Sequence, residues 1–90
     1  MNKKMLLYEV INDGEKISLI DESEWLINPG DMPTVCTWIP TAEIEIEKID
    51  DNSMFNYKLT NLETGESVKA RNIKKGKGRK YLQTLQNLIL

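Results

Sequence analysis

The sequence contains no histidine and a single cysteine among its 90 residues. Without histidine, the chain lacks the commonest general base and metal ligand of proteins. Cys36 has no histidine to activate it as a nucleophile and no second cysteine for an intramolecular disulfide. No motif pairs carboxylates for acid–base chemistry. We therefore expect a protein that is not an enzyme, binds no cofactor or metal, and resides in a reducing compartment.

Long apolar runs are also missing. No segment approaches the roughly 20 apolar residues that span a bilayer, and Met5–Tyr8 is too short for a signal peptide because Glu9 follows at once. Hydrophobic residues make up 40% of the chain and charged residues 29%, which is ordinary for one small globular domain. We expect a single cytoplasmic domain over residues 1–90, with no membrane association.

Acidic residues are absent from the last part of the chain. Residues 1–73 hold all 14 acidic residues and seven of the 12 basic ones, so their net charge is −7, whereas residues 74–90 have a net charge of +5. The five cations lie in a predicted loop over residues 74–80, in which Gly76 and Gly78 would let the backbone approach a phosphate. The alternative is a solvated linker that balances the acidic body. The candidate nucleic-acid contacts are Lys74, Lys75, Lys77, Arg79 and Lys80.

Strict alternation of apolar and acidic residues dominates the centre of the chain. Residues 42–49 place Ala42, Ile44 and Ile46 on one face, which predicts a strand with one buried side. Further strands are predicted over residues 54–61 and 66–71. A four-residue loop over residues 62–65, with Gly65 at positive φ, would pair Leu59 with Val68 and Tyr57 with Ala70.

The segments before this sheet are also rich in strand signals. Residues 4–20 predict a β-hairpin that turns at Asp13-Gly14, which would place Val10 opposite Ile17 and Tyr8 opposite Leu19. Residues 25–27 fit a helical turn or a short strand. The composition of residues 34–39 predicts another strand, with Cys36 as a small core or interface residue.

The hydrophobic period changes near the end of the chain. Residues 80–90 predict an amphipathic helix, with its apolar side chains at helical spacing. A helix this short must pack on something to be stable. It would pack either on the sheet of the same chain or on a partner. The apolar face comprises Tyr81, Leu82, Leu85, Leu88 and Ile89.

From Gly30 onward the layout resembles a small SH3-like barrel of the Tudor or KOW sort. The resemblance rests on Gly30-Asp31, the strands at residues 35–38, 42–49, 54–61 and 66–71, and the turn at residues 62–65, which together cover about half the chain. It implies a mainly β fold, with the sheet at residues 30–73 and the N-terminal hairpin and C-terminal helix as additions. Such barrels bind peptides, RNA, DNA or modified side chains, so the fold does not identify a ligand. Trp38 and Tyr57 are the candidates for an aromatic cage of the kind that some Tudor domains use.

Two functions follow as hypotheses. The first is a regulator associated with nucleic acid through the basic loop. The alternative is an adaptor or inhibitor that binds protein through the acidic sheet face, the tryptophans or the C-terminal helix. The acidic face can equally be a solvated surface partly neutralised by Lys58 and Lys69, and the tryptophans can equally be core. The candidate protein contacts are Trp25, Trp38, Glu43, Glu45 and Glu47.

Overall fold

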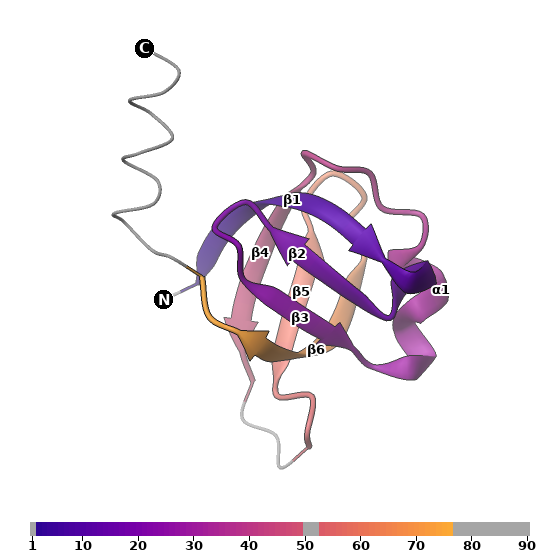
Figure 1. Ribbon diagram of the computed structural model, residues 1–90, viewed down its shortest axis with the longest axis vertical. Coiled ribbons are helices and arrows are strands. Elements are labelled where there is room, and N and C mark those ends of the chain that lie inside the picture. Colours follow the sequence, from indigo (N-terminus) through magenta and orange to yellow (C-terminus); the bar gives the residue numbers. More distant parts are fainter. Residues whose placement is uncertain (1, 50–52, 77–90) are drawn as a thin grey trace.

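Six antiparallel strands close into a small barrel (Figure 1). The computed structural model describes residues 2–49 and 53–76. Around the barrel, the strands follow the order β1-β2-β3-β6-β5-β4, and β4 returns to β1. The strands are β1 (Lys3–Ile11), β2 (Lys16–Leu19), β3 (Glu24–Ile27), β4 (Glu43–Lys48), β5 (Tyr57–Asn61) and β6 (Ser67–Lys74).

The barrel is built from two three-stranded meanders, β1-β2-β3 and β4-β5-β6. Pairing of β1 with β4 and of β3 with β6 joins the meanders at both edges, so no strand edge is left open. The N-terminal hairpin is therefore part of the barrel, and the prediction that it is an addition to a sheet at residues 30–73 is wrong.

At fold level the structure is consistent with an SH3-like barrel. The finer likeness to Tudor or KOW domains stays a prediction.

The predicted pairing of the central strands is confirmed. Leu59 lies opposite Val68 and Tyr57 opposite Ala70. Asn61 Oδ1 accepts two hydrogen bonds from the turn, from the Glu63 backbone nitrogen over 2.9 Å and from the Thr64 backbone nitrogen over 3.3 Å. Gly65 has a φ of +80°, a backbone conformation that glycine adopts readily because it has no side chain. β5 begins at Tyr57 rather than at residue 54, and β6 extends to Lys74 rather than ending at residue 71.

The N-terminal hairpin is confirmed with one change of register. Val10 lies opposite Ile17 as predicted, but Leu7 rather than Tyr8 lies opposite Leu19. A β-bulge between Leu7 and Glu9 adds one residue to β1 and causes the shift. As a result Leu7 is buried, while Tyr8 and the following Glu9 are both exposed.

The connection between the two meanders differs from the prediction. Residues 25–27 belong to strand β3, so the strand alternative is confirmed. Residues 34–39 form no strand, because the segment contains the short helix α1 (Met32–Val35), followed by a turn. Pro33 suits the first turn of a helix, where its missing N–H costs nothing. Val35 and Trp38 are buried at a helical spacing of three, whereas Cys36 is exposed. The core alternative for Cys36 is therefore wrong, and the interface alternative stays a prediction.

The core fills the barrel and continues beneath α1. Both tryptophans belong to it, with Trp25 6% and Trp38 4% exposed, so the core alternative for them is confirmed. Short 3₁₀ turns, η1 (Asn12–Gly14) and η2 (Pro29–Asp31), lie with α1 at one end of the barrel.

Nowhere in residues 2–49 and 53–76 is a helix long and apolar enough to cross a membrane. The helix predicted over residues 80–90 lies outside the described residues.

Candidate functional site

The two ends of the barrel differ in construction. At one end, α1 and η1 are tied together by the Cys36 thiol, which donates to the Asp13 carbonyl oxygen over 2.6 Å. At the other end meet the start of β1, the β2–β3 turn, the last residues of β4 and the end of β6 (Figure 1). We call the second end the basic end, because Lys3, Lys48, Lys74 and Lys75 lie there.

A cavity of about 300 Å³ lies at the basic end. Trp25 and Tyr57 form part of its wall, with ring centroids 5.0 Å apart and planes at 77° in an edge-to-face arrangement. Tyr57 is half-buried, and its position at the first residue of β5 follows from the pairing with Ala70. Lys3 and Lys75 line the same cavity, although they come from opposite ends of the described chain.

A chain of hydrogen bonds fixes the β2–β3 turn beside this cavity. The Trp25 indole nitrogen donates to the Ser23 hydroxyl over 3.0 Å, and that hydroxyl donates to Asp21 Oδ1 over 2.6 Å. The Ser23 backbone nitrogen donates to the same carboxylate oxygen over 3.0 Å. Asp21 is only 7% exposed, so its charge is held inside by these donors. Asp21 thus adds a buried acidic side chain to the cavity that Lys3 and Lys75 also line.

Gly76 brings the end of the described chain against the Asp21 carboxylate. A β-carbon at Gly76 would overlap the carboxylate oxygens, so only glycine fits without displacing a buried, hydrogen-bonded side chain. The predicted role of Gly76 was to admit a phosphate. In the structure its lack of a side chain serves a contact with Asp21 within the protein.

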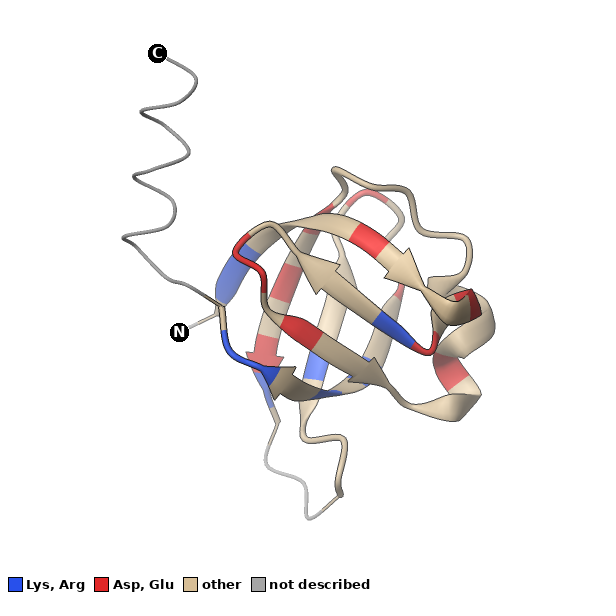
Figure 2. Cartoon of the chain, viewed as in Figure 1, with Lys and Arg blue, Asp and Glu red and all other residues tan. Residues whose placement is uncertain are grey.

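Cations from segments that are distant in sequence lie at the basic end, beside acidic residues of the β2–β3 turn, β3 and β4 (Figure 2). Lys3 begins β1, and Lys48 ends β4 two positions beyond Ile46, the partner of Lys3. Lys74 ends β6, so it belongs to a strand and not to the predicted loop. Its Nζ lies 4.0 Å from Glu24 Oε2, and half of its side chain remains exposed. Lys77, Arg79 and Lys80 lie outside the described residues.

The aromatic candidates do not share a pocket. Tyr57 contacts Trp25 at the basic end. Trp38 packs in the core near α1, and its indole nitrogen donates to Glu66 Oε1 over 3.0 Å. The described structure thus brings Trp38 and Tyr57 into no common cage, and neither Trp25 nor Trp38 presents its ring as an exposed protein contact.

The predicted acidic face is an outward surface of β4. Glu45 lies opposite Lys4 of β1, and Glu47 lies opposite Lys58 of β5. Lys69 lies opposite Lys58, one strand further from the glutamates. Glu45 and Glu47 thus each lie opposite one basic residue, which agrees with the solvated-surface alternative, whereas Glu43 lies opposite Leu6. Whether these glutamates contact a protein stays a prediction.

Sequence reasoning missed Lys3 as a member of the basic end. The sequence shows that Lys3 is basic, but the position of Lys3 depends on the pairing of β1 with β4. This pairing closes the barrel and brings the start of β1 to the same end of the barrel as the end of β6. Comparison with protein-family models, with curated proteins and with solved structures produced no significant match.

Proposed function

We propose that the protein is a non-enzymatic binding module that associates with nucleic acid through its basic end. One observation carries the proposal: Lys3 and Lys75 line one cavity, immediately before the segment that contains Lys77, Arg79 and Lys80. Lys75, from the C-terminal basic segment, is therefore joined in space by a cation from the first strand. Several cations at one end can neutralise neighbouring phosphates, which is the main source of affinity for a nucleic-acid backbone.

The charge of the remaining surface supports one orientation of the barrel relative to nucleic acid. Residues 1–73 carry a net charge of −7, which repels a polyanion from most of the barrel. Nucleic acid would then approach the basic end alone. With Tyr57 half-buried against Trp25, little aromatic surface is offered for stacking, so we expect contacts to the backbone and little sequence preference.

The proposal is tested by the fluorescence anisotropy of a labelled DNA duplex and a labelled RNA over a series of salt concentrations. We expect binding at low salt that weakens as salt rises, and loss of binding when the five cations at positions 74, 75, 77, 79 and 80 become glutamine. The double variant Lys3→Gln/Lys75→Gln should also weaken binding, because it removes the two cations that line the cavity.

The matched control is Lys58→Gln/Lys69→Gln, which removes the same charge from the β5–β6 surface. Circular dichroism shows whether each variant folds. No binding at low salt, or equal losses in the control and in Lys3→Gln/Lys75→Gln, would contradict a specific role for the basic end.

A second candidate function is a protein-binding adaptor. It is favoured by an acidic cavity on the β1-β2-β3 surface, which lies apart from the predicted Glu43/Glu45/Glu47 stripe. The acidic side chains that line that cavity would attract a cationic ligand.

A further inference from the structure

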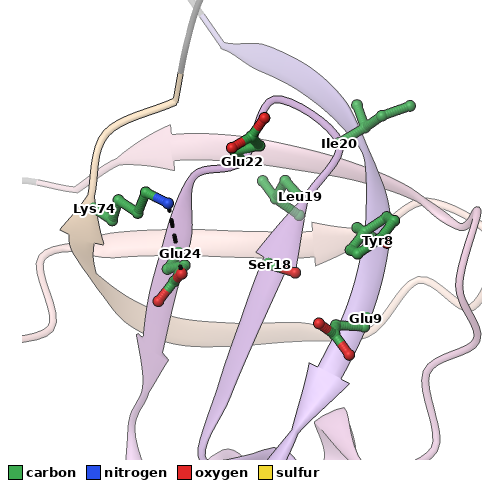
Figure 3. A pocket seen from close by; sticks show the side chains of 8 residues that line it. All are labelled: Tyr8, Glu9, Ser18, Leu19, Ile20, Glu22, Glu24 and Lys74. Atoms are coloured by element: carbon green, nitrogen blue, oxygen red, sulfur yellow. Dashed lines mark ion pairs between the residues drawn. The ribbon is translucent and has the colours of Figure 1, made fainter.

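A second cavity, of about 360 Å³, opens on the outer surface of β1, β2 and β3 (Figure 3). Three carboxylates and one ammonium group face it, and an exposed tyrosine forms one side. The residues that matter for its chemistry are Tyr8, Glu9, Ser18, Glu22, Glu24 and Lys74. Its formal charge is therefore negative even with Lys74 present.

Strand pairing places four of these residues in one row. Glu9 lies opposite Ser18, Ser18 opposite Glu24, and Glu24 opposite Lys74. Ser18 is the small residue of the row, so a hollow forms above it between the longer side chains on either side. Lys16 Nζ at 3.4 Å and Lys74 Nζ at 4.0 Å already neutralise part of the charge of Glu24.

The β-bulge in β1 completes the hollow. Regular alternation would place Tyr8 and Glu9 on opposite faces of the sheet. The bulge instead exposes both side chains, and Tyr8 remains 64% exposed. An aromatic ring and a carboxylate thus stand next to each other on the same side of Ser18 (Figure 3). Within the described residues, Glu9 has no ion pair or side-chain hydrogen bond.

The floor of the hollow contains an unsatisfied polar group. Ser18 is 8% exposed, and its hydroxyl has no hydrogen-bond partner among the described residues. The hydroxyl is directed toward the Tyr8 and Glu9 side of the cavity (Figure 3). A buried hydroxyl without a partner is costly, so a ligand that donates a hydrogen bond there removes an existing penalty.

The spacing of the carboxylates favours an organic cation over a metal ion. Glu9 and Glu24 lie on the two strands that flank β2, so their backbones are about 10 Å apart, twice the usual strand separation. Across the part of the chain that the structure describes, no three acidic or cysteine side chains converge as metal ligands. A guanidinium group carries its charge over a plane with five donors and stacks on aromatic rings.

We infer that this cavity binds the guanidinium group of an arginine side chain presented by a protein partner. The group stacks on Tyr8, donates to the Glu9 carboxylate and the Ser18 hydroxyl, and is attracted by Glu24 from the other side. A protein is the expected source because the cavity is shallow enough to leave Tyr8 exposed, and because its negative charge repels nucleic acid. Lys74 lines this cavity and is also one of the proposed phosphate contacts, but Tyr8, Glu9 and Ser18, which would hold the guanidinium group, are not among those contacts.

The test is a titration of the full chain with N-acetyl-arginine-N-methylamide, followed by amide chemical shifts in two-dimensional NMR spectra. We expect saturable shifts at residues 8, 9, 18 and 24. The capped citrulline analogue, which is neutral and similar in shape, should cause none. A capped Gly-Arg-Gly peptide, which presents the arginine side chain on a peptide backbone as a protein would, should shift the same amides.

Glu9→Gln should weaken binding roughly tenfold, the factor expected for one charge-assisted hydrogen bond. The control Glu63→Gln makes the same change of charge at an exposed position of the β5–β6 turn and should leave binding unchanged. Both positions are exposed, so both variants should fold. The inference is overturned if the probe causes no saturable shift at these amides, if capped lysine binds as tightly, or if the two variants behave alike.

Discussion

At the residue scale, the buried polar side chains of this protein divide into satisfied and unsatisfied groups. Asn61 is 1% exposed and accepts from two backbone nitrogens of the β5–β6 turn. Asp21 and Ser23 satisfy each other and the Trp25 indole. Ser18 is the exception, with a buried hydroxyl that lacks a partner in the described structure. This contrast leads to two opposite predictions for removal of a buried polar group.

Replacement of Ser18 by alanine should raise the free energy of unfolding by about 1 kcal/mol, because it removes an unsatisfied buried hydroxyl. Urea denaturation of both proteins measures the difference. Ser67→Ala serves as the control, since the Ser67 hydroxyl is exposed and lies 2.8 Å from the Thr60 hydroxyl. A loss of stability in Ser18→Ala would mean that the hydroxyl is satisfied in solution.

Replacement of Asn61 by alanine should lower the free energy of unfolding by about 1–3 kcal/mol, because the turn nitrogens of Glu63 and Thr64 lose their acceptor. The same denaturation experiment applies. Thr64→Ala removes a more exposed contact of the same turn, the 3.2 Å bond from the Glu66 nitrogen, and should cost less. Equal losses of unfolding free energy in the two variants would show that the burial of Asn61 contributes nothing to stability.

At the element scale, the N-terminal hairpin is what closes the barrel. β1 pairs with both β2 and β4, and β2 pairs with both β1 and β3. Leu7, Ile17 and Leu19 supply three of the fully buried side chains of the core. Without these two strands, β3 and β4 would each lose a neighbour and the interior would open to water.

A fragment that begins at residue 24 should therefore be unfolded, with the circular dichroism of a random coil and no dispersion of amide resonances. A chain that ends at Gly76 should stay folded, because all six strands lie within residues 3–74. If the fragment from residue 24 folded on its own, the sheet at residues 30–73 would be an independent unit after all.

At the scale of the whole molecule, charge is separated between the barrel and the end of the chain. If Lys3 and each of the five cations at positions 74–80 neutralise one phosphate, the logarithm of the association constant for duplex DNA should fall against the logarithm of salt concentration with a slope of about −5 to −6. Anisotropy titrations at several salt concentrations give the slope. The five-glutamine variant keeps Lys3 and should have a slope of about −1, and an unchanged slope would place the contacts elsewhere.

The sequence by itself determined the strands of the second meander, the register of β5 and β6, and the Val10–Ile17 pairing. These features depend on residues close together in the chain, where alternation and turn-forming residues act locally. The same local signals were misleading at residues 34–39, where β-rich composition was overridden by the need to connect β3 to β4 and to cover one end of the core.

Only the tertiary structure decided the closure of the barrel, the bulge at Tyr8, and the meeting of Lys3 with Lys75. Each of these depends on pairing between segments far apart in the sequence, which no local pattern encodes. The row of Glu9, Ser18, Glu24 and Lys74 has the same origin, since each member comes from a different strand. Charge and hydrophobic period were therefore readable in the chain, whereas the grouping of side chains into two candidate sites followed from strand order and register.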